Sequence, residues 1–309
     1  MRKYESEIAV IIPCYNEAKT VADVIKGYKE VLPTADIYVI DNNSKDGTDE
    51  IARVNGAIVL YEYKQGKGNA VKCAFRKIKA KCYIMVDGDN TYPPDRAKEM
   101  CDLILQEKAD MVIGDRLSST YFKENKRRFH GFGNKLVRNL INLIFKSKVK
   151  DVMTGSRAFS CDFVRGFPIL SKGFEIETEL TIHALDKNYR IIEMPVPYQD
   201  RIEDSFSKLN TFKDGIKVLK TIATLFKEYK PALFFNLCAM IPLVFSIVLI
   251  VPVLSEYFET GLVPKFPSLI ASGIFLVVSL LLWICGIILS VINKKHRQLY
   301  ELIMNQNID

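Results

Sequence analysis

The sequence lacks charged side chains over two long stretches, residues 231–255 and 266–292. Each is longer than the roughly 20 apolar residues that a helix needs to cross the hydrocarbon core of a bilayer. A purely water-soluble protein is therefore not expected, although the overall composition, 49% hydrophobic and 26% charged, is that of a globular protein. Because the connector is short, the two stretches predict an antiparallel transmembrane hairpin over residues 231–293.

Several common site motifs are also missing. No GxGxxG follows the first predicted strand and no GxxxxGK[ST] occurs, which disfavours dinucleotide-binding dehydrogenases and phosphate-loop ATPases. The seven cysteines have no paired metal-type spacing, so we expect reduced thiols and no zinc site. The N-terminus, MRKYESEIAV, lacks the apolar region of a secretory signal, and we expect no cleavage there. We predict no nucleic-acid partner.

The positive charge is unevenly distributed. The net charge of +7 belongs entirely to residues 1–230, since later charges cancel. Basic side chains gather before the first apolar stretch and after the second: Lys213, Lys217, Lys220, Lys227 and Lys230, then Lys294, Lys295 and Arg297. The positive-inside rule predicts a two-span protein of the cell membrane with both termini and residues 1–230 in the cytoplasm. Residues 208–230 have the pattern of a basic amphipathic juxtamembrane helix, and residues 294–309 form a predicted cytoplasmic tail.

The first part of the chain alternates strand and helix patterns. Apolar runs predict strands at residues 8–13, 36–41, 57–61, 82–87 and 109–115. Helix-compatible segments lie between them, at residues 17–30, 47–54, 67–81 and 95–106. This order predicts an α/β catalytic domain over residues 1–207, built on a mostly parallel sheet with both faces covered. Ligands bind such sheets beyond the carboxyl ends of the strands.

Asp87-Gly88-Asp89 stands at one such strand end and is the most informative segment. Two carboxylates two residues apart repel each other unless a cation lies beside them. Carboxylate oxygens suit Mg²⁺ or Mn²⁺, which keep open positions for diphosphate oxygens. We therefore predict a metal held by Asp87 and Asp89, although a polar turn that caps the next helix would give the same pattern.

Two other strand ends carry polar loops. Asp41 opens the segment DNNSKDGT and is well placed to accept hydrogen bonds from a base or ribose, while a turn with a helix N-cap is the alternative. Lys67 lies between Gly66 and Gly68, where the chain can closely approach an anion. A flexible surface loop explains this last pattern nearly as well.

Together these segments resemble glycosyltransferase family 2, which has the GT-A fold. The resemblance rests on IIPCYNE at residues 11–17, on the three strand-end segments above, and on GDR at 114–116, DVMTGSRAF at 151–159, FEIETEL at 174–180 and EMPVPYQDR at 193–201. The later segments are similar to the polyprenyl-phosphate glycosyltransferases, the group of dolichol-phosphate mannose synthase and the bactoprenol glucosyltransferases. The resemblance covers about residues 8–230.

The resemblance implies roles for the matching positions. It implies that the nucleotide sugar is held by Pro13, Tyr15, Asn16, Glu17, Asp41, Lys67, Gly68 and Asp87. Asp89 would be the principal metal ligand, and the family treats the carboxylate at Asp151 as catalytic. Thr91 stands where some relatives carry a further glutamine ligand, and the single tryptophan, Trp283, lies in a span rather than in the QxxRW motif of processive synthases.

Arginines are expected to grip the lipid phosphate, since guanidinium groups bind phosphate oxygens bidentately. The candidates are Arg116, Arg127, Arg128, Arg157, Arg201 and Lys208. We count Arg201 among the catalytic residues with Asp89 and Asp151. Because a phosphate monoester is already a dianion near neutral pH, we expect Asp151 to orient arginines or acceptor rather than remove a proton. Helical spacing places Glu175 and Glu179 on one face and predicts that Glu177 points away.

The predicted function is metal-dependent, inverting transfer of a hexose from a nucleotide sugar, UDP-hexose in preference, to a polyprenyl or dolichyl phosphate. The alternatives are a dolichol-phosphate mannose synthase that uses GDP-mannose, a glycosyltransferase acting on another glycolipid, and an inactive membrane-bound module that binds nucleotide sugars. Homo-oligomers could assemble through the hairpin.

Overall fold

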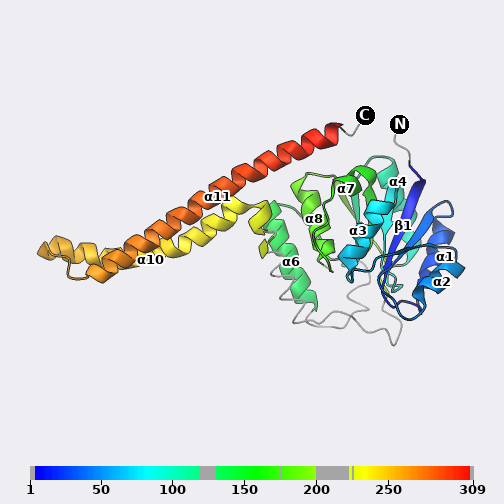
Figure 1. Cartoon of the computed structure of the whole chain (residues 1–309), viewed down its shortest axis with the longest axis horizontal. Helices are drawn as coiled ribbons and strands as arrows, with labels where there is room; N and C mark the ends of the chain where they lie inside the picture. Colours follow the sequence, from blue (N-terminus) through cyan, green and yellow to red (C-terminus); the bar gives the residue numbers. More distant parts are fainter. Residues whose placement is uncertain (1–3, 119–129, 174, 200–222, 225, 307–309) are drawn as a thin grey trace. The chain divides into compact units, whose positions relative to one another are not determined.

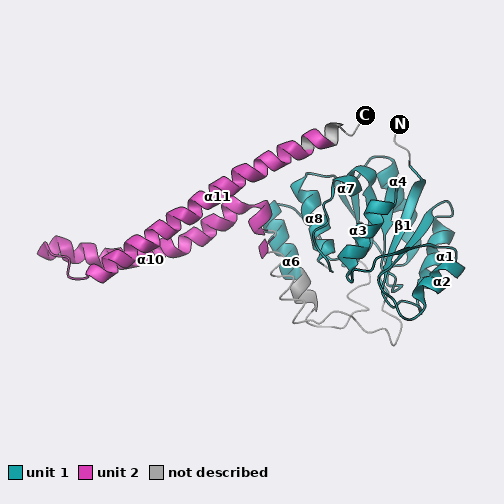
Figure 2. Ribbon diagram, in the orientation of Figure 1, with its two compact units in different colours: residues 1–219 teal, residues 220–309 magenta. Residues whose placement is uncertain are grey.

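The computed structural model describes residues 4–118, 130–173, 175–199, 223–224 and 226–306. The chain divides into two compact units, residues 1–219 and 220–309 (Figure 2). The predicted boundary at residue 207 and most of the predicted juxtamembrane helix lie outside the described residues.

The first unit is built on a seven-stranded sheet in the order β3-β2-β1-β4-β6-β5-β7 (Figure 1). The strands are β1 (Ser6–Cys14), β2 (Asp36–Asp41), β3 (Ile58–Tyr61), β4 (Ala80–Met85), β5 (Met111–Asp115), β6 (Arg157–Ser160) and β7 (Ile191–Pro195). Only β6 is antiparallel to its neighbours, β4 and β5. The mostly parallel sheet predicted from the apolar runs is therefore confirmed.

Helices cover both faces of this sheet (Figure 1). Their bounds are α1 (Val21–Val31), α2 (Thr48–Val54), α3 (Lys67–Lys77), the 3-10 turn η1 (Pro94–Arg96), α4 (Ala97–Leu105), α6 (His130–Phe145), α7 (Cys161–Gly166) and α8 (Ile176–Asp186). Alternate side chains of β1, among them Val10 and Ile12, pack with α1 and α4 in the main core. On α3, Phe75 packs edge-on against Phe159 of β6. The predicted helix over 67–81 is too long: Ile78 is already extended and β4 begins at Ala80.

Parallel strands place their carboxyl ends at one edge, and β1, β2 and β4 are adjacent. In register, Cys14 lies beside Asp41 and Asp41 beside Tyr61, so the loops that follow these strands start side by side. The three predicted polar segments therefore come from one edge of the sheet.

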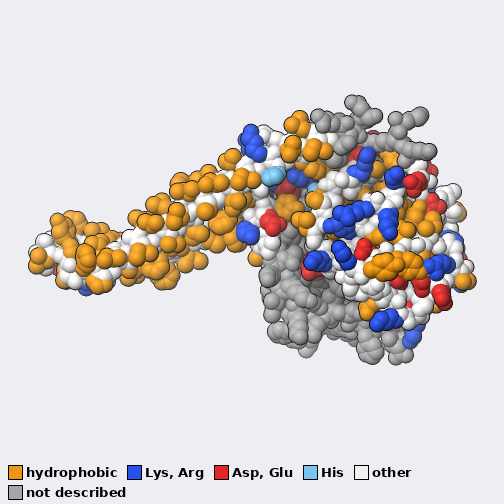
Figure 3. Space-filling view, viewed as in Figure 1, with side chains coloured by type: hydrophobic (Ala, Val, Ile, Leu, Met, Phe, Trp, Pro, Cys, Tyr) orange, Lys and Arg blue, Asp and Glu red, His pale blue; other side chains and the backbone are white. Residues whose placement is uncertain are grey.

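The second unit is a helical hairpin, α10 (Pro231–Thr260) and α11 (Phe266–Gln306). Both helices are long and apolar enough to cross a membrane, and only 17% and 11% of their most apolar windows are buried. Their exposed side chains are hydrophobic along most of the unit (Figure 3), unlike those of a helix in a soluble core. Helix α11 continues without a break through most of the predicted tail. The hydroxyls of Ser246 and Ser279 donate to carbonyls of the opposite helix, at 2.9 Å each, and join the pair.

Candidate active site

The loop after β1 is bound to the loop after β2. The backbone N–H of Asn16 donates to Ser44 Oγ at 3.0 Å and that of Glu17 donates to Thr48 Oγ1 at 2.9 Å. Asn16 has a φ of 55°, in the left-handed region that asparagine tolerates, and its Oδ1 accepts from the N–H of Lys45. Tyr15 is exposed at the same edge, and Pro13 is half-buried in β1, one residue before the strand ends at the buried Cys14. The predicted nucleotide-binding residues of this segment are thus held in one fixed loop.

Asp41 is buried beneath these two loops, with 4% of its surface exposed. Its Oδ2 accepts from the N–H of Ser44 at 3.2 Å. Its Oδ1 has no hydrogen-bond partner in the part of the chain that the structure describes. A buried carboxylate oxygen without a donor is unfavourable, so this atom is ready for a donor supplied by a ligand.

Lys67 and Gly68 begin α3 at the same edge. The ammonium of Lys67 forms ion pairs with Asp87 and with Glu177, the latter at 2.6 Å. Burial alone would lower the pKa of Lys67, but the two carboxylates outweigh it and raise that pKa above its usual value, so the group stays charged. Burial raises the pKa of Glu177. Glu177, which helical spacing sets apart from Glu175 and Glu179, is the one of these three glutamates that pairs with Lys67.

Asp87 and Asp89 follow β4 and differ in burial. The Asp87 side chain is 26% exposed beside Lys67, whereas Asp89 is 5% exposed as a residue and accepts from Thr91 Oγ1 at 2.7 Å. Asn90, between Asp89 and Thr91, has a φ of 58° and makes this turn tight. Among the described residues, no group of three His, Cys, Asp or Glu side chains is close enough to hold a metal. A cation here would need further ligands besides these two carboxylates.

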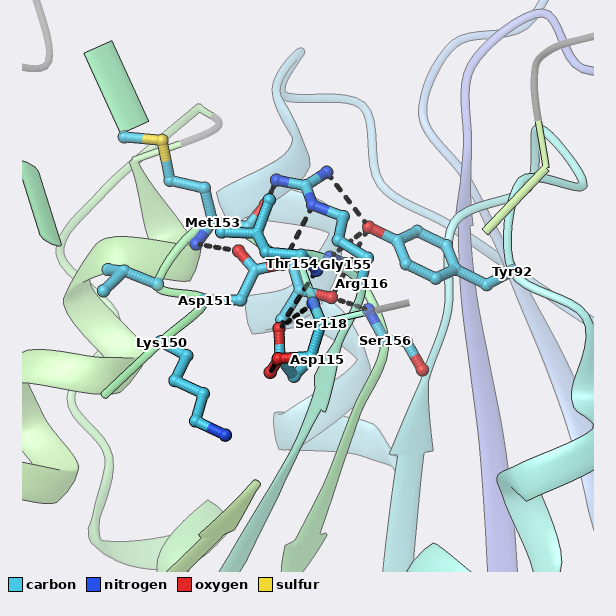
Figure 4. Close-up of polar contacts among 12 residues, drawn as sticks. Tyr92, Asp115, Arg116, Ser118, Lys150, Asp151, Met153, Thr154, Gly155 and Ser156 are labelled. Atoms are coloured by element: carbon cyan, nitrogen blue, oxygen red, sulfur yellow. Dashed lines mark hydrogen bonds and ion pairs between the residues drawn. The ribbon is translucent and has the colours of Figure 1, made fainter. Parts of the chain in front are cut away.

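Arg116 lies beyond β5, between three partners (Figure 4). Its Nε donates to Asp151 Oδ2 at 3.0 Å, its Nη2 to the Met153 carbonyl at 2.8 Å, and its Nη1 to Tyr92 Oη at 3.3 Å. Asp151 is 1% exposed and Arg116 remains 13% exposed in its side chain. The arginine is therefore held in one orientation, with a small part of its side chain exposed.

Tyr92 is a site residue that the sequence analysis missed. Its hydroxyl accepts from the N–H of Gly155 at 3.0 Å as well as from Arg116. It thereby joins the segment that carries Asp89 to the loop that carries Asp151. Burial raises the pKa of Tyr92, so it acts here as a neutral hydrogen-bonding group. The one sequence feature that could have pointed to Tyr92 is its position three residues after Asp89.

Arg157 does not fit the predicted contact with a lipid phosphate. It is fully buried on β6. Its guanidinium donates to the carbonyls of Val152 and Thr154 and to Thr181 Oγ1, at 2.6, 3.2 and 2.9 Å. These bonds hold the backbone of residues 151–156 in place, so Arg157 has a structural role rather than a contact with a ligand. The other predicted phosphate ligands, Arg127, Arg128, Arg201 and Lys208, lie outside the described residues.

Comparisons with known proteins agree that this chain is similar to glycosyltransferases. The family described as Glycosyl transferase family 2 matches residues 9–167. Glycosyltransferase AglJ of Haloferax volcanii is 33% identical over 230 residues, which are 74% of this chain and 75% of AglJ. A dolichyl-phosphate hexose transferase of the same organism is 30% identical over 216 residues, covering 70% of this chain and 92% of the relative.

The fold has solved counterparts. One is the glucosyl-3-phosphoglycerate synthase of Mycobacterium tuberculosis in complex with Mn²⁺, UDP and glucosyl-3-phosphoglycerate. It superposes with a TM-score of 0.58 at 20% identity and covers 72% of this chain and 80% of the synthase. The GT-A architecture expected from the sequence is thus confirmed.

Proposed function

Because the chain belongs to glycosyl transferase family 2, we propose that it transfers a hexose from a nucleotide sugar to the phosphate of a polyprenyl phosphate. The observation that carries the proposal is the buried Oδ1 of Asp41, which lacks a donor among the described residues. A nucleobase supplies such donors as ring N–H groups. From a base at Asp41, the diphosphate would extend toward Lys67 at the start of α3 and Asp87 just after β4.

The donor set at Asp87 and Asp89 fits a hard divalent cation, Mg²⁺ or Mn²⁺. The two carboxylates offer oxygen ligands, and diphosphate oxygens and water would supply the others, as Mg²⁺ sites commonly require. When bound, the cation would stabilise the negative charge of the departing diphosphate. The synthase of similar fold was crystallised with Mn²⁺ and UDP, which supports this assignment and a UDP-sugar donor.

The acceptor follows from chemistry and from the relatives. A phosphate monoester has a second pKa near ~6, so at neutral pH its oxygen is already a nucleophile and needs no strong general base. Arg116 would position this phosphate, and Asp151 would hold Arg116 rather than accept a proton. The relative named a dolichyl-phosphate hexose transferase supports a polyprenyl acceptor. We further propose a cytoplasmic site, because basic residues precede the first uncharged stretch and follow the second, whereas the connector between the two stretches carries one lysine and two glutamates.

The purified full-length protein in detergent, given Mg²⁺, a labelled nucleotide sugar and a defined polyprenyl phosphate, tests this function. When UDP-glucose, UDP-N-acetylglucosamine and GDP-mannose are tested separately, one of these donors should yield an acid-labile labelled lipid. Alkali-stable transfer to diacylglycerol would instead support a glycosyltransferase with another acceptor. Absence of transfer from every donor would support an inactive binding module.

Replacement of Asp41 tests the nucleotide site separately. Asp41→Asn removes the charge that a base N–H would meet, and we expect the affinity for the nucleoside diphosphate to fall about 10-fold, since hydrogen bonds to charged groups contribute ~1.5–3 kcal/mol. Calorimetric titration with UDP and GDP measures the effect. Asp36→Asn is a matched control, because Asp36 lies at the opposite end of β2 from Asp41 and accepts a hydrogen bond from Ser6. Equal affinities in Asp41→Asn and the unaltered protein would contradict the assignment.

A further inference from the structure

The ammonium of Lys67 contacts one of the two carboxylates expected to bind the cation. It pairs with Asp87 Oδ1 and, at 2.6 Å, with Glu177 Oε1, and the Lys67 side chain is only 7% exposed. The three groups come from the start of α3, from the segment just after β4 and from the first turn of α8. One positive charge is therefore shared by two carboxylates at a nearly buried position.

The backbone around Lys67 is held in place on both sides. A Cβ at Gly66 or Gly68 would come within 2.1 or 2.3 Å of the carbonyl oxygens of Lys172 and Ser171, so the two chain segments touch directly. Glu179 in turn accepts from the N–H groups of Leu170 and Ser171, at 3.0 and 2.9 Å. The start of α3 thus has little freedom to move, and only the flexible side chain of Lys67 can change partners.

Asp87 has equally little freedom. A Cβ at Gly155 would lie 2.2 Å from Asp87 Oδ2, so this oxygen lies against the backbone of residue 155. Its other oxygen, Oδ1, faces Lys67. A divalent cation that approaches Asp87 must therefore meet the ammonium at close range, where like charges repel strongly because little water screens them.

We propose that Lys67 occupies the cation's place on Asp87 while no nucleotide is bound, and releases Asp87 only when a diphosphate arrives as its new partner. Glu177 holds the ammonium beside the site in both states. The metal and the nucleoside diphosphate then bind together rather than in sequence. The inference rests on the proposed function, since it takes Asp87 and Asp89 as ligands of the cation.

The coupling is reciprocal by thermodynamic necessity: if the nucleotide strengthens metal binding, the metal strengthens nucleotide binding by the same factor. The protein without nucleotide would hold Mg²⁺ or Mn²⁺ weakly, and free cations would not fill the site before the sugar donor. Lys67 is in this account a positioning residue for the cation and a direct ligand of the diphosphate.

Mn²⁺ binding to the full-length protein in detergent, followed by electron paramagnetic resonance with and without UDP or GDP, tests the inference without any measurement of turnover. Lys67→Met should bind Mn²⁺ at least about 10-fold more tightly than the unaltered protein when no nucleotide is present, a factor typical of coupled sites. The factor by which UDP or GDP strengthens Mn²⁺ binding should shrink correspondingly. Glu177→Gln should weaken Mn²⁺ binding in the absence of nucleotide, because Lys67 then has Asp87 as its main partner.

The double variant Lys67→Met/Glu177→Gln separates direct occupation from net charge. It removes one positive and one negative charge, so the total charge of Lys67, Asp87 and Glu177 is unchanged. It also leaves no unpaired carboxylate at residue 177, which matters if Lys67→Met alone folds poorly. Tighter Mn²⁺ binding by this variant without nucleotide supports the inference. Lys72→Met is the matched control on the same helix, since Lys72 donates to the Ile169 carbonyl at 2.9 Å, and should leave Mn²⁺ binding unchanged.

Unchanged or weaker Mn²⁺ binding in both Lys67 variants, with normal nucleotide-dependent binding in the unaltered protein, would overturn the role of Lys67 and leave the proposed function standing. Failure of the unaltered protein to bind Mn²⁺ even with UDP or GDP would overturn both.

Discussion

Asp89→Asn is expected to lower the rate of glycosyl transfer by at least about 10²-fold, as loss of a main electrostatic stabiliser of a transition state does. Asparagine has nearly the same shape and keeps an oxygen for the Thr91 hydroxyl, which donates to Asp89 Oδ1 at 2.7 Å. The fold should therefore persist while the negative charge offered to the cation is lost. Because the ligand itself is altered, raising the Mg²⁺ or Mn²⁺ concentration should not restore the rate.

The measurement is initial rate against Mg²⁺ concentration, with thermal denaturation to confirm that the variant is folded. Asp95→Asn provides the control: it lies six residues further on, in η1, is exposed, and should retain full activity. Near-normal turnover by Asp89→Asn would contradict the assignment of Asp89 as the principal metal ligand.

The second large effect is expected from Asp151→Asn. Asp151 is buried and its Oδ2 accepts from Arg116 Nε at 3.0 Å. Removing one charge of a buried ion pair lowers the free energy of unfolding by roughly 3–5 kcal/mol when the partner's charge is left uncompensated. We expect kcat/KM for the polyprenyl phosphate to fall about 10²-fold, because the arginine loses the partner that orients it, while affinity for the nucleoside diphosphate changes little.

Steady-state kinetics with varied lipid, alongside calorimetric titration with UDP and GDP, separate these two effects. Asp110→Asn is a suitable comparison, since Asp110 pairs with Arg190 at the opposite end of β5 from Arg116. The Arg190 side chain is 58% exposed. It should leave the lipid dependence intact. A loss of nucleotide affinity in Asp151→Asn as large as the loss for the lipid would argue against the positioning of Arg116 toward the acceptor.

The position of the site could be predicted from sequence because it depends on local patterns. Apolar runs that end in polar residues marked β1, β2 and β4, and parallel strands necessarily bring such ends to one edge. The uncharged stretches likewise predicted α10 and α11, which begin at Pro231 and Phe266 as expected. Local sequence patterns are sufficient for these features.

The side-chain partners could not be predicted in the same way. Every residue of α8 from Ile176 to Ala184 is buried, so no exposed face exists to show which way Glu177 points. Arg157 stands in a segment that resembles the family pattern, but its burial follows from β6 lying antiparallel between β4 and β5. That placement depends on long-range pairing, which periodicity does not reveal.

The central claim is that the phosphate oxygen of the lipid is the atom that receives the sugar. Phosphorus NMR of the lipid product over a range of pH tests it most directly, because a phosphate monoester titrates near ~6 and a diester has no second ionisation. The lipid product should give a single phosphorus signal that does not shift between pH 5 and 8. A product whose phosphate still titrates, or one with two coupled phosphorus signals from a diphosphate, would contradict it.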